Sequence, residues 1–388
     1  MRLIVGQKHL NLPKSIAVTC SVLIALALSG NGLSAKATET QPANKTFGDW
    51  CREKASLSPE AKHTVEVMLR KAKTTECDAA DRKLSSLTEF YLDNNDISDI
   101  KPLQSLTQLT NLELRYNKIS DIKPLQSLTN LTNLTLSDSQ ISDIKPLESL
   151  TNLTNLTLSE NQISDIKPLE SLTNLTGLYL HENQITDIKP LASLTKLSYL
   201  TIHSNKISDI KPLRSFTNVT ELVLNNNEIS DIKPLASFTN LTSLVLDNNK
   251  ISDIKPLQSL TKLTHLYLNE NQISDIKPLA SFTKLTSLSL DNIQISDIKL
   301  LASLTNLTSL NLRNNKISDI KPLESLTNLT QLNLDDNEIM DIKPLASLTQ
   351  LSYIDLHENQ ISDIKPLVQL GVNTQTIKQP RLYPYMST

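Results

Sequence analysis

The chain has 388 residues, of which 4% are aromatic and only 6 are glycine, so a collagen-like chain of about one-third glycine is excluded. The same shortage of glycine argues against a glycine-rich phosphate-binding loop. The formal charge is −3, and removing residues 1–37, which carry four cations and no acids, leaves −7, a value that argues against nucleic acid or an anionic membrane as the main partner.

The first recognisable element is an apolar run over residues 15–29 that comes after several cations. The run is shorter than the ~20 residues of a membrane-spanning helix, and Ala35, Lys36 and Ala37 match a small-x-small cleavage pattern. We therefore interpret residues 1–37 as a secretory signal peptide. The chain is then expected to be exported and to have no membrane span after cleavage; the alternative is a leader retained as an anchor.

Residues 38–83 are interpreted as a linker followed by a helical segment. Ser58 is a suitable helix N-cap, and Pro59 suits the first helical position. The apolar face of this helix is formed by Val65, Met68 and Leu69.

Two cysteines, Cys51 and Cys77, flank the predicted helix. An exported chain folds where disulfides persist, so a bond between them would tie the helix to the next segment of the chain. Two unpaired thiols are the alternative.

From residue 84 the sequence repeats every 22 residues without insertion, and thirteen units end at residue 369. A marker aspartate recurs at Asp99, Asp121, Asp143, Asp165, Asp187, Asp209, Asp231, Asp253, Asp275, Asp297, Asp319, Asp341 and Asp363. In the unit 128–149, the apolar residues are Leu128, Leu131, Leu134, Leu136, Ile141, Ile144 and Leu147. Leu134 and Leu136 alternate with a polar residue and predict a short strand, and Pro146 begins a return on the opposite side.

One such unit is too small to bury its own leucines, so neighbouring units must stack and share a continuous core. The strands then align into a parallel sheet. The sequence therefore predicts an α/β repeat solenoid over residues 84–369, with residues 370–388 as a carboxyl-terminal cap or tail.

An asparagine column comes after the predicted strands. Its amides carry donors and an acceptor that can satisfy backbone groups outside the sheet ladder. The column consists of Asn95, Asn117, Asn161, Asn183, Asn205, Asn227, Asn249, Asn271, Asn315, Asn337 and Asn359. Two units depart from it, and we expect Ser139 to replace part of the bonding but Ile293 to replace none. Because Leu300 also replaces the proline, unit 282–303 is expected to be the loosest in the interior.

The aspartate and lysine columns of the Ser-Asp-Ile-Lys-Pro-Leu segment do not vary among the thirteen units, and the lysines run from Lys101 to Lys365. We interpret them as a solvated edge whose opposite charges offset one another. A calcium-binding aspartate column is less favoured, because lysine is an unsuitable neighbour for a cation site.

The repeat pattern Leu-x-x-Leu-x-x-Leu-x-Leu-x-x-Asn-x-Ile-x-Asp-Ile-x-Pro-Leu runs from Leu84 to Gln369 and resembles the 22-residue leucine-rich repeat of the bacterial internalins. The resemblance implies a leucine-rich-repeat horseshoe with a parallel sheet on its concave side and short 3₁₀ turns on its convex side. It also implies a small amino-terminal cap, a role that residues 45–83 can fill.

Function is expected on the concave side, because the exposed strand positions there vary from unit to unit. They sum to about −11 in formal charge, which favours a protein partner with basic groups over a glycan. Tyrosine, which is enriched in binding hot spots, collects on the same positions. The residues that we predict to bind the partner are Tyr179, His181, Glu182, Tyr199, His203, His265, Tyr267 and Tyr116.

Enzymatic chemistry finds little support in the sequence. His181 and Glu182 begin like a zinc-protease motif, but Ile185 stands where the second histidine belongs, and His181 with His203 lacks a third metal ligand. We therefore expect no catalytic residue, metal or cofactor, and a monomeric, non-enzymatic binding module. The alternatives are a cytosolic leucine-rich-repeat regulator of another enzyme and, more remotely, a metal-dependent hydrolase.

Overall fold

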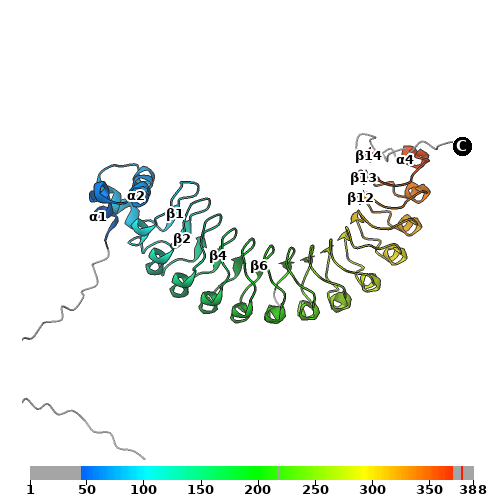
Figure 1. The fold of residues 1–388 in the computed structure, drawn as a ribbon, viewed down its shortest axis with the longest axis horizontal. Helices are drawn as coiled ribbons and strands as arrows, with labels where there is room; N and C mark the ends of the chain where they lie inside the picture. Colours follow the sequence, from blue (N-terminus) through cyan, green and yellow to red (C-terminus); the bar gives the residue numbers. More distant parts are fainter. Residues whose placement is uncertain (1–44, 217–218, 370–376, 379–388) are drawn as a thin grey trace, which may run out of the picture. The chain divides into compact units, whose positions relative to one another are not determined.

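The computed structural model describes residues 45–216, 219–369 and 377–378, all within one unit, Asn44–Thr388. The predicted signal peptide and most of the predicted tail lie outside the described residues. Within this unit, each turn of the chain contributes one short strand and one helical turn, and the turns stack in sequence order (Figure 1).

Three α-helices and one 3₁₀ helix form the amino-terminal cap: α1 (Phe47–Arg52), η1 (Lys54–Ser56), α2 (Pro59–Ala72) and α3 (Cys77–Ser85). Ser58 caps α2 by accepting a hydrogen bond from the Ala61 N–H at 3.2 Å, and Pro59 is its first residue, as predicted. The predicted apolar face is buried. The helix α3 ends at Ser85, so it continues two residues into the first predicted repeat.

The cap is held to itself and to the first repeat by specific bonds. A disulfide joins Cys51 of α1 to Cys77 of α3, which confirms the predicted pair. Thr64 lies on α2, and its hydroxyl donates a hydrogen bond to the Asp99 carbonyl oxygen at 2.7 Å. This bond connects the cap to the first repeat.

The fourteen strands of the described residues form one parallel sheet in sequence order, and each pairs with the next in a register of 22 residues up to β13. The strands are β1 (Glu89–Tyr91), β2 (Asn111–Glu113), β3 (Asn133–Thr135), β4 (Asn155–Thr157), β5 (Gly177–Tyr179), β6 (Tyr199–Thr201), β7 (Glu221–Val223), β8 (Ser243–Val245), β9 (His265–Tyr267), β10 (Ser287–Ser289), β11 (Ser309–Asn311), β12 (Gln331–Asn333), β13 (Tyr353–Asp355) and β14 (Ile377–Lys378). They line the concave side of this unit in Figure 1.

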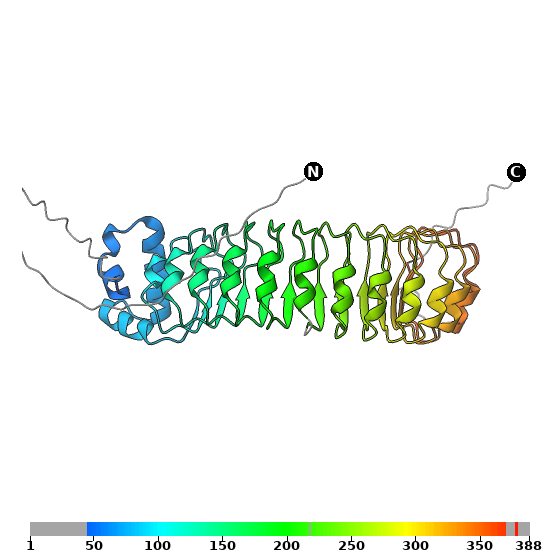
Figure 2. The same ribbon diagram turned by 90° about the horizontal axis from the view of Figure 1, so that it is seen from below.

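Helical turns occupy the convex side, where Figure 2 shows them in a row. They are η2 (Lys101–Leu103), η3 (Lys123–Ser127), η4 (Lys145–Ser149), η5 (Lys167–Ser171), η6 (Lys189–Ser193), η7 (Lys211–Ser215), η8 (Lys233–Ser237), η9 (Lys255–Ser259), η10 (Lys277–Ser281), η11 (Lys299–Ser303), η12 (Lys321–Ser325), η13 (Lys343–Ser347) and α4 (Lys365–Gln369). The last turn is thus α-helical, whereas the other twelve are 3₁₀.

The marker aspartates have a structural role that the charge pattern did not indicate. In each of the thirteen units the carboxylate accepts the backbone N–H of the lysine two residues later, at 2.8–3.0 Å. This bond satisfies a donor at the start of the helical turn that no helical carbonyl reaches. Lysine ammonium groups pair with the same aspartates in only four units, among the described residues.

The predicted apolar rows form one continuous core. In the unit 128–149, all seven predicted apolar side chains are at most 1% exposed. Each row therefore packs against the equivalent rows of its two neighbours, which is the arrangement that a unit of this size requires.

The asparagine column is buried and bonded as predicted. The Asn161 amide nitrogen lies 2.8 Å from the Leu136 carbonyl oxygen and 3.2 Å from that of Leu158, and donates to both. Its Oδ1 accepts the Ile141 N–H at 3.0 Å. Ten of the eleven asparagines are at most 9% exposed; the exception is Asn95, which has no preceding repeat to bond.

The prediction for Ser139 was wrong. Its hydroxyl is buried but has no hydrogen-bond partner among the described residues, because the short side chain does not reach the groups that an amide bonds. Ile293 is also buried, and Gln294 beside it takes a left-handed φ of 65°. The low stability expected for unit 282–303 stays a prediction that amide hydrogen exchange can test.

Replacing Ser139 with asparagine should raise the free energy of unfolding by about 1 kcal/mol. The amide oxygen can accept a hydrogen bond from the Ile119 N–H, and the change removes a buried hydroxyl that has no hydrogen-bond partner among the described residues. The reverse change, Asn161→Ser, should lower it by a similar amount. Urea unfolding monitored by circular dichroism measures both. Equal midpoints for Ser139→Asn and wild type would contradict the role given to the amide.

Candidate functional site

The structure brings together the central residues of the predicted binding cluster, on strands β5 and β6 and the bends after them. The Tyr179 and Tyr199 rings lie 5.0 Å apart between centroids, and the His181 and His203 rings stack at 4.6 Å. Two aromatic pairs therefore lie on adjacent strands of the sheet face, where no described element covers them (Figure 1).

Of the remaining predicted residues, Glu182 lies on the bend after β5 with φ of 55°, and the other three divide into two groups. Tyr116 is 59% exposed and lines a hollow together with Tyr179, so it joins the cluster. His265 and Tyr267 are on β9, three strands beyond β6, and the Tyr267 hydroxyl accepts a hydrogen bond from Ser287 at 3.2 Å. They belong to a separate part of the face.

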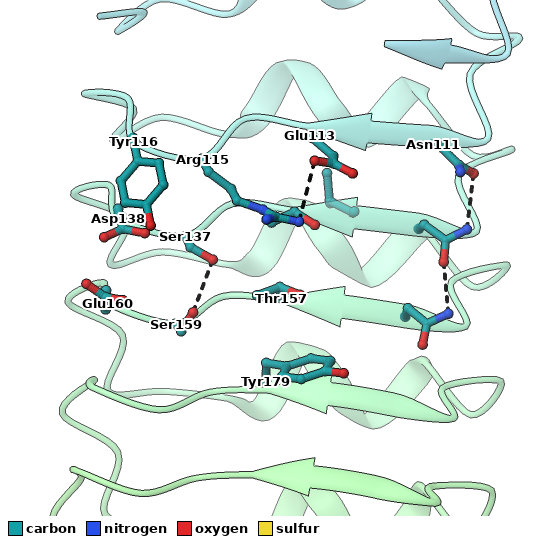
Figure 3. Close-up of a pocket in the computed structure, with 14 residues that line it drawn as sticks. Asn111, Glu113, Arg115, Tyr116, Ser137, Asp138, Thr157, Ser159, Glu160 and Tyr179 are labelled. Atoms are coloured by element: carbon teal, nitrogen blue, oxygen red, sulfur yellow. Dashed lines mark hydrogen bonds and ion pairs between the residues drawn. The ribbon is translucent and has the colours of Figure 1, made fainter. Parts of the chain in front are cut away.

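A hollow of about 650 Å³ opens over β2–β5 on the concave face (Figure 3). It is lined by Asn111, Glu113, Arg115, Tyr116, Asn133, Leu134, Thr135, Ser137, Asp138, Asn155, Thr157, Ser159, Glu160 and Tyr179.

The hollow exists because two successive repeats present small side chains between two that present large ones. Ser137 and Ser159 are buried and bonded to each other at 3.1 Å, at the position that carries Arg115 one repeat before and His181 one repeat after. The in-register stacking places these four residues in one row. The serines therefore form the floor of the hollow, and the larger side chains of Arg115, Tyr116 and Tyr179 border it.

A row of side-chain amides crosses one margin of the hollow. Asn133 donates to the Asn111 amide oxygen at 3.1 Å, and Asn155 donates to that of Asn133 at 2.8 Å. The row ends at Gly177, where a Cβ atom would lie 2.5 Å from the Asn155 oxygen. Among the described residues, this last amide oxygen accepts no hydrogen bond.

Carboxyl groups dominate the opposite margin, on the bends after β3 and β4. A hydrogen bond with Asp138 raises the pKa of Glu160 to about 7, with further contributions from burial and from the negative charges of Asp138 and Glu182. The one cation of the lining, Arg115, pairs with Glu113 at 3.4 Å.

Other titratable groups on this face also have shifted pKa values. Burial raises the pKa of Asp247 to about 6, assisted by the charges of Glu270 and Asp291 and opposed by a hydrogen bond from the Asn269 N–H. Burial lowers the pKa of His181 and of His203, and for His203 the neighbouring His181 adds to the effect. Burial therefore disfavours the charged form of both rings.

The described residues hold no group of three histidine, cysteine, aspartate or glutamate side chains arranged to bind a metal ion. A search of the same residues for a helix with the length and hydropathy needed to span a membrane finds none.

Several lining residues were not identified from the sequence, namely Glu113, Arg115, Asp138 and Glu160. The signal that could have found them is the succession of two Leu-Thr-Leu-Ser segments, at residues 134–137 and 156–159. Small residues at both outward-facing positions of consecutive units predict a depression in a stacked sheet.

Comparison with known proteins agrees with this architecture. A family model described as Leucine Rich repeats (2 copies) matches residues 85–127, 129–171, 173–215, 217–259, 261–303, 283–325, 305–347 and 327–369. A solved internalin of Listeria monocytogenes, InlF, is similar with a TM-score of 0.77 and 35% identity, over 85% of this chain and 97% of that chain.

More distant structures share the fold alone. A leucine-rich repeat protein of Leptospira interrogans has a TM-score of 0.63 and 22% identity, over 76% of this chain and 91% of that chain. A plant peptide hormone receptor, RGFR1, solved in complex with RGF2, has a TM-score of 0.62 and 22% identity, over 73% of this chain and 49% of that chain. No curated protein sequence matches the chain significantly.

Asp247→Asn should stabilise the protein at neutral pH. The folded-state pKa of Asp247 lies above its ordinary value of 3.8, so its contribution to stability is full below pH 4 and is lost as the pH rises through 6. The variant should therefore melt at a higher temperature than wild type at pH 7.5, and the difference should vanish near pH 4.

Thermal unfolding between pH 4 and 7.5 checks this expectation, with Asp336→Asn, an exposed carboxylate on a bend, as the control. The His181 and His203 contributions run the other way, because their depressed pKa values favour the folded state above pH 6.5. Both histidines are present in the variant and in the wild type, so their contributions to stability cancel when the two proteins are compared at the same pH. A melting difference that does not change with pH would disprove the assignment.

Proposed function

Because the chain belongs to the internalin type of bacterial leucine-rich repeat proteins, we propose that it is an exported, non-enzymatic module that binds a protein partner on its concave sheet face. The observation that carries this proposal is the pairing of Tyr179 with Tyr199 and of His181 with His203 beside the hollow. Aromatic side chains on an uncovered face bury a large area at low cost in side-chain entropy.

Negative charge on this face indicates the chemistry of the partner. The outward-facing concave positions sum to a formal charge of about −11, whereas the chain without residues 1–37 carries a formal charge of −7. A partner that presents lysine and arginine complements this surface, and its binding should weaken as salt screens the charges.

Export is supported by the disulfide between Cys51 and Cys77, because such bonds persist in oxidising compartments. Amino-terminal sequencing of the protein isolated from its host tests whether the leader is cleaved on export. A first residue near position 38 agrees with cleavage of the leader. Retention of residues 1–37 in a cytoplasmic fraction favours the alternative of an intracellular regulator.

The double change Tyr179→Ala and Tyr199→Ala should weaken partner binding about thirtyfold or more, because truncating hot-spot aromatics costs ~2 kcal/mol. Both rings lie on the surface of the sheet, so the melting temperature should stay nearly unchanged. Binding is measured with a partner captured by the wild-type chain from host envelope or target-cell extract and then purified.

Tyr91→Ala is the matched control, because Tyr91 is 48% exposed on the same sheet face but lies outside the hollow and the aromatic cluster. The proposal that this cluster binds the partner would be wrong if the double variant keeps its affinity, or if the control loses as much affinity as the double variant.

A further inference from the structure

The lining of the hollow over β2–β5 carries more negative than positive charge, because Glu113, Asp138 and Glu160 contribute carboxyl groups and only one lining residue is cationic. Asp138 and Glu160 present carboxyl groups on one margin, and the unbonded amide oxygen of Asn155 lies on the other. Arg115, the one cationic lining residue, is already paired with Glu113. A complementary occupant must therefore bring donors and positive charge.

The geometry of the two carboxyl groups results from the stacking. Asp138 and Glu160 occupy the same position of consecutive repeats, on bends with φ of 54° and 55°, so adjacent strands hold their backbones ~4.8 Å apart. No lysine or arginine among the described residues forms an ion pair with either. Figure 3 shows both on the margin of the hollow that Tyr116 also borders.

From this arrangement we propose that the hollow receives one lysine or arginine side chain from a loop of the protein partner, with its cationic head held by Asp138 and Glu160. The proposal rests on the proposed function and specifies where a basic group of the partner binds. Tyr116 and Tyr179 form the walls, where an aromatic ring can contact a cation or its aliphatic stem.

The proton between the two carboxyl groups links this binding to pH. Near neutrality the pair retains a proton for part of the time, because the pKa of Glu160 is about 7, and an incoming cation displaces this proton to solvent. Binding should therefore tighten as the pH rises from 6 to 8. The other charged or titratable groups around the pair are Glu113, Arg115, Tyr116, His181 and Glu182.

These neighbours do not reverse the expected sign. Arg115 and Glu113 offset each other, and Glu182 adds negative charge that favours a cation. Burial lowers the pKa of His181, so its ring is neutral at pH 8 and adds no repulsion there.

The test uses the peptide acetyl-Lys-Gly-Lys-Gly-Lys-amide as the probe and the glutamine analogue as the uncharged reference, with affinity measured by calorimetry or NMR titration. The double variant Asp138→Asn and Glu160→Gln should weaken probe binding about tenfold, because it removes charge-assisted hydrogen bonds. It should also abolish the pH dependence between 6 and 8.

Asp336→Asn combined with Glu358→Gln is the matched control. It removes the same two charges from the same bend position of consecutive repeats, far along the sheet from the hollow. The control should change probe affinity less than twofold. Equal weakening in both variants, wild-type binding that is the same at pH 6 and pH 8, or tight binding of the glutamine analogue would overturn the proposal.

The outcome is distinguishable from failure of the proposed function. If the probe does not discriminate between the variants while Tyr179→Ala with Tyr199→Ala still loses the partner, only the cation site is wrong. If the probe discriminates but the tyrosine changes leave partner binding intact, the hollow stands and the aromatic cluster loses its role.

Discussion

Each 22-residue turn can bury its leucines and isoleucines only against the turn before it and the turn after it. This constraint fixes the register of the whole sheet, because a shift of one residue would move the apolar rows out of the core. The buried amides of residues such as Asn161 reinforce the register, since each bonds backbone groups of its own turn and of the preceding one. The parallel sheet and the convex turns result from the same stacking.

The register also determines how a binding surface can arise. Residues 22 apart in sequence become neighbours in space, so the concave face is a set of columns whose members vary independently of the core. The hollow results from Ser137 and Ser159 in adjacent repeats, and the aromatic cluster results from Tyr179 and Tyr199 in the next pair. Recognition chemistry therefore changes over distances of one or two strands, while the backbone stays the same.

Much of this architecture could be predicted from the sequence, because a constant period and seven apolar positions per unit leave few ways to bury the chain. The helix after Ser58, the Cys51–Cys77 pair and the asparagine column follow from local rules of capping, spacing and hydrogen-bond capacity. Periodicity does not reveal the reach of individual side chains. It could not show that the Ser139 hydroxyl stays unpaired, or that the marker aspartates bond the backbone.

The candidate site was predictable in part. Tyrosine and histidine are rare in this chain, so their recurrence on exposed strand positions drew attention to Tyr179 and His181. The hollow beside them results from small side chains. Serine and threonine are so common in the repeat that these positions cannot be recognised from the sequence by residue type. The elevated pKa of Glu160 depends on its hydrogen bond with Asp138 of the adjacent repeat, and only the folded structure reveals this contact.

The in-register stack makes the recognition surface adjustable in discrete steps. Every unit has the same length, so inserting one whole unit between β4 and β5, or deleting the unit that carries β4, preserves each column and its core rows. Such a change displaces the Tyr179 wall from the Arg115 wall by one strand spacing, ~4.8 Å, and leaves the backbone of both walls intact. Gain and loss of whole turns can therefore resize the cavity for a different ligand without redesigning the scaffold.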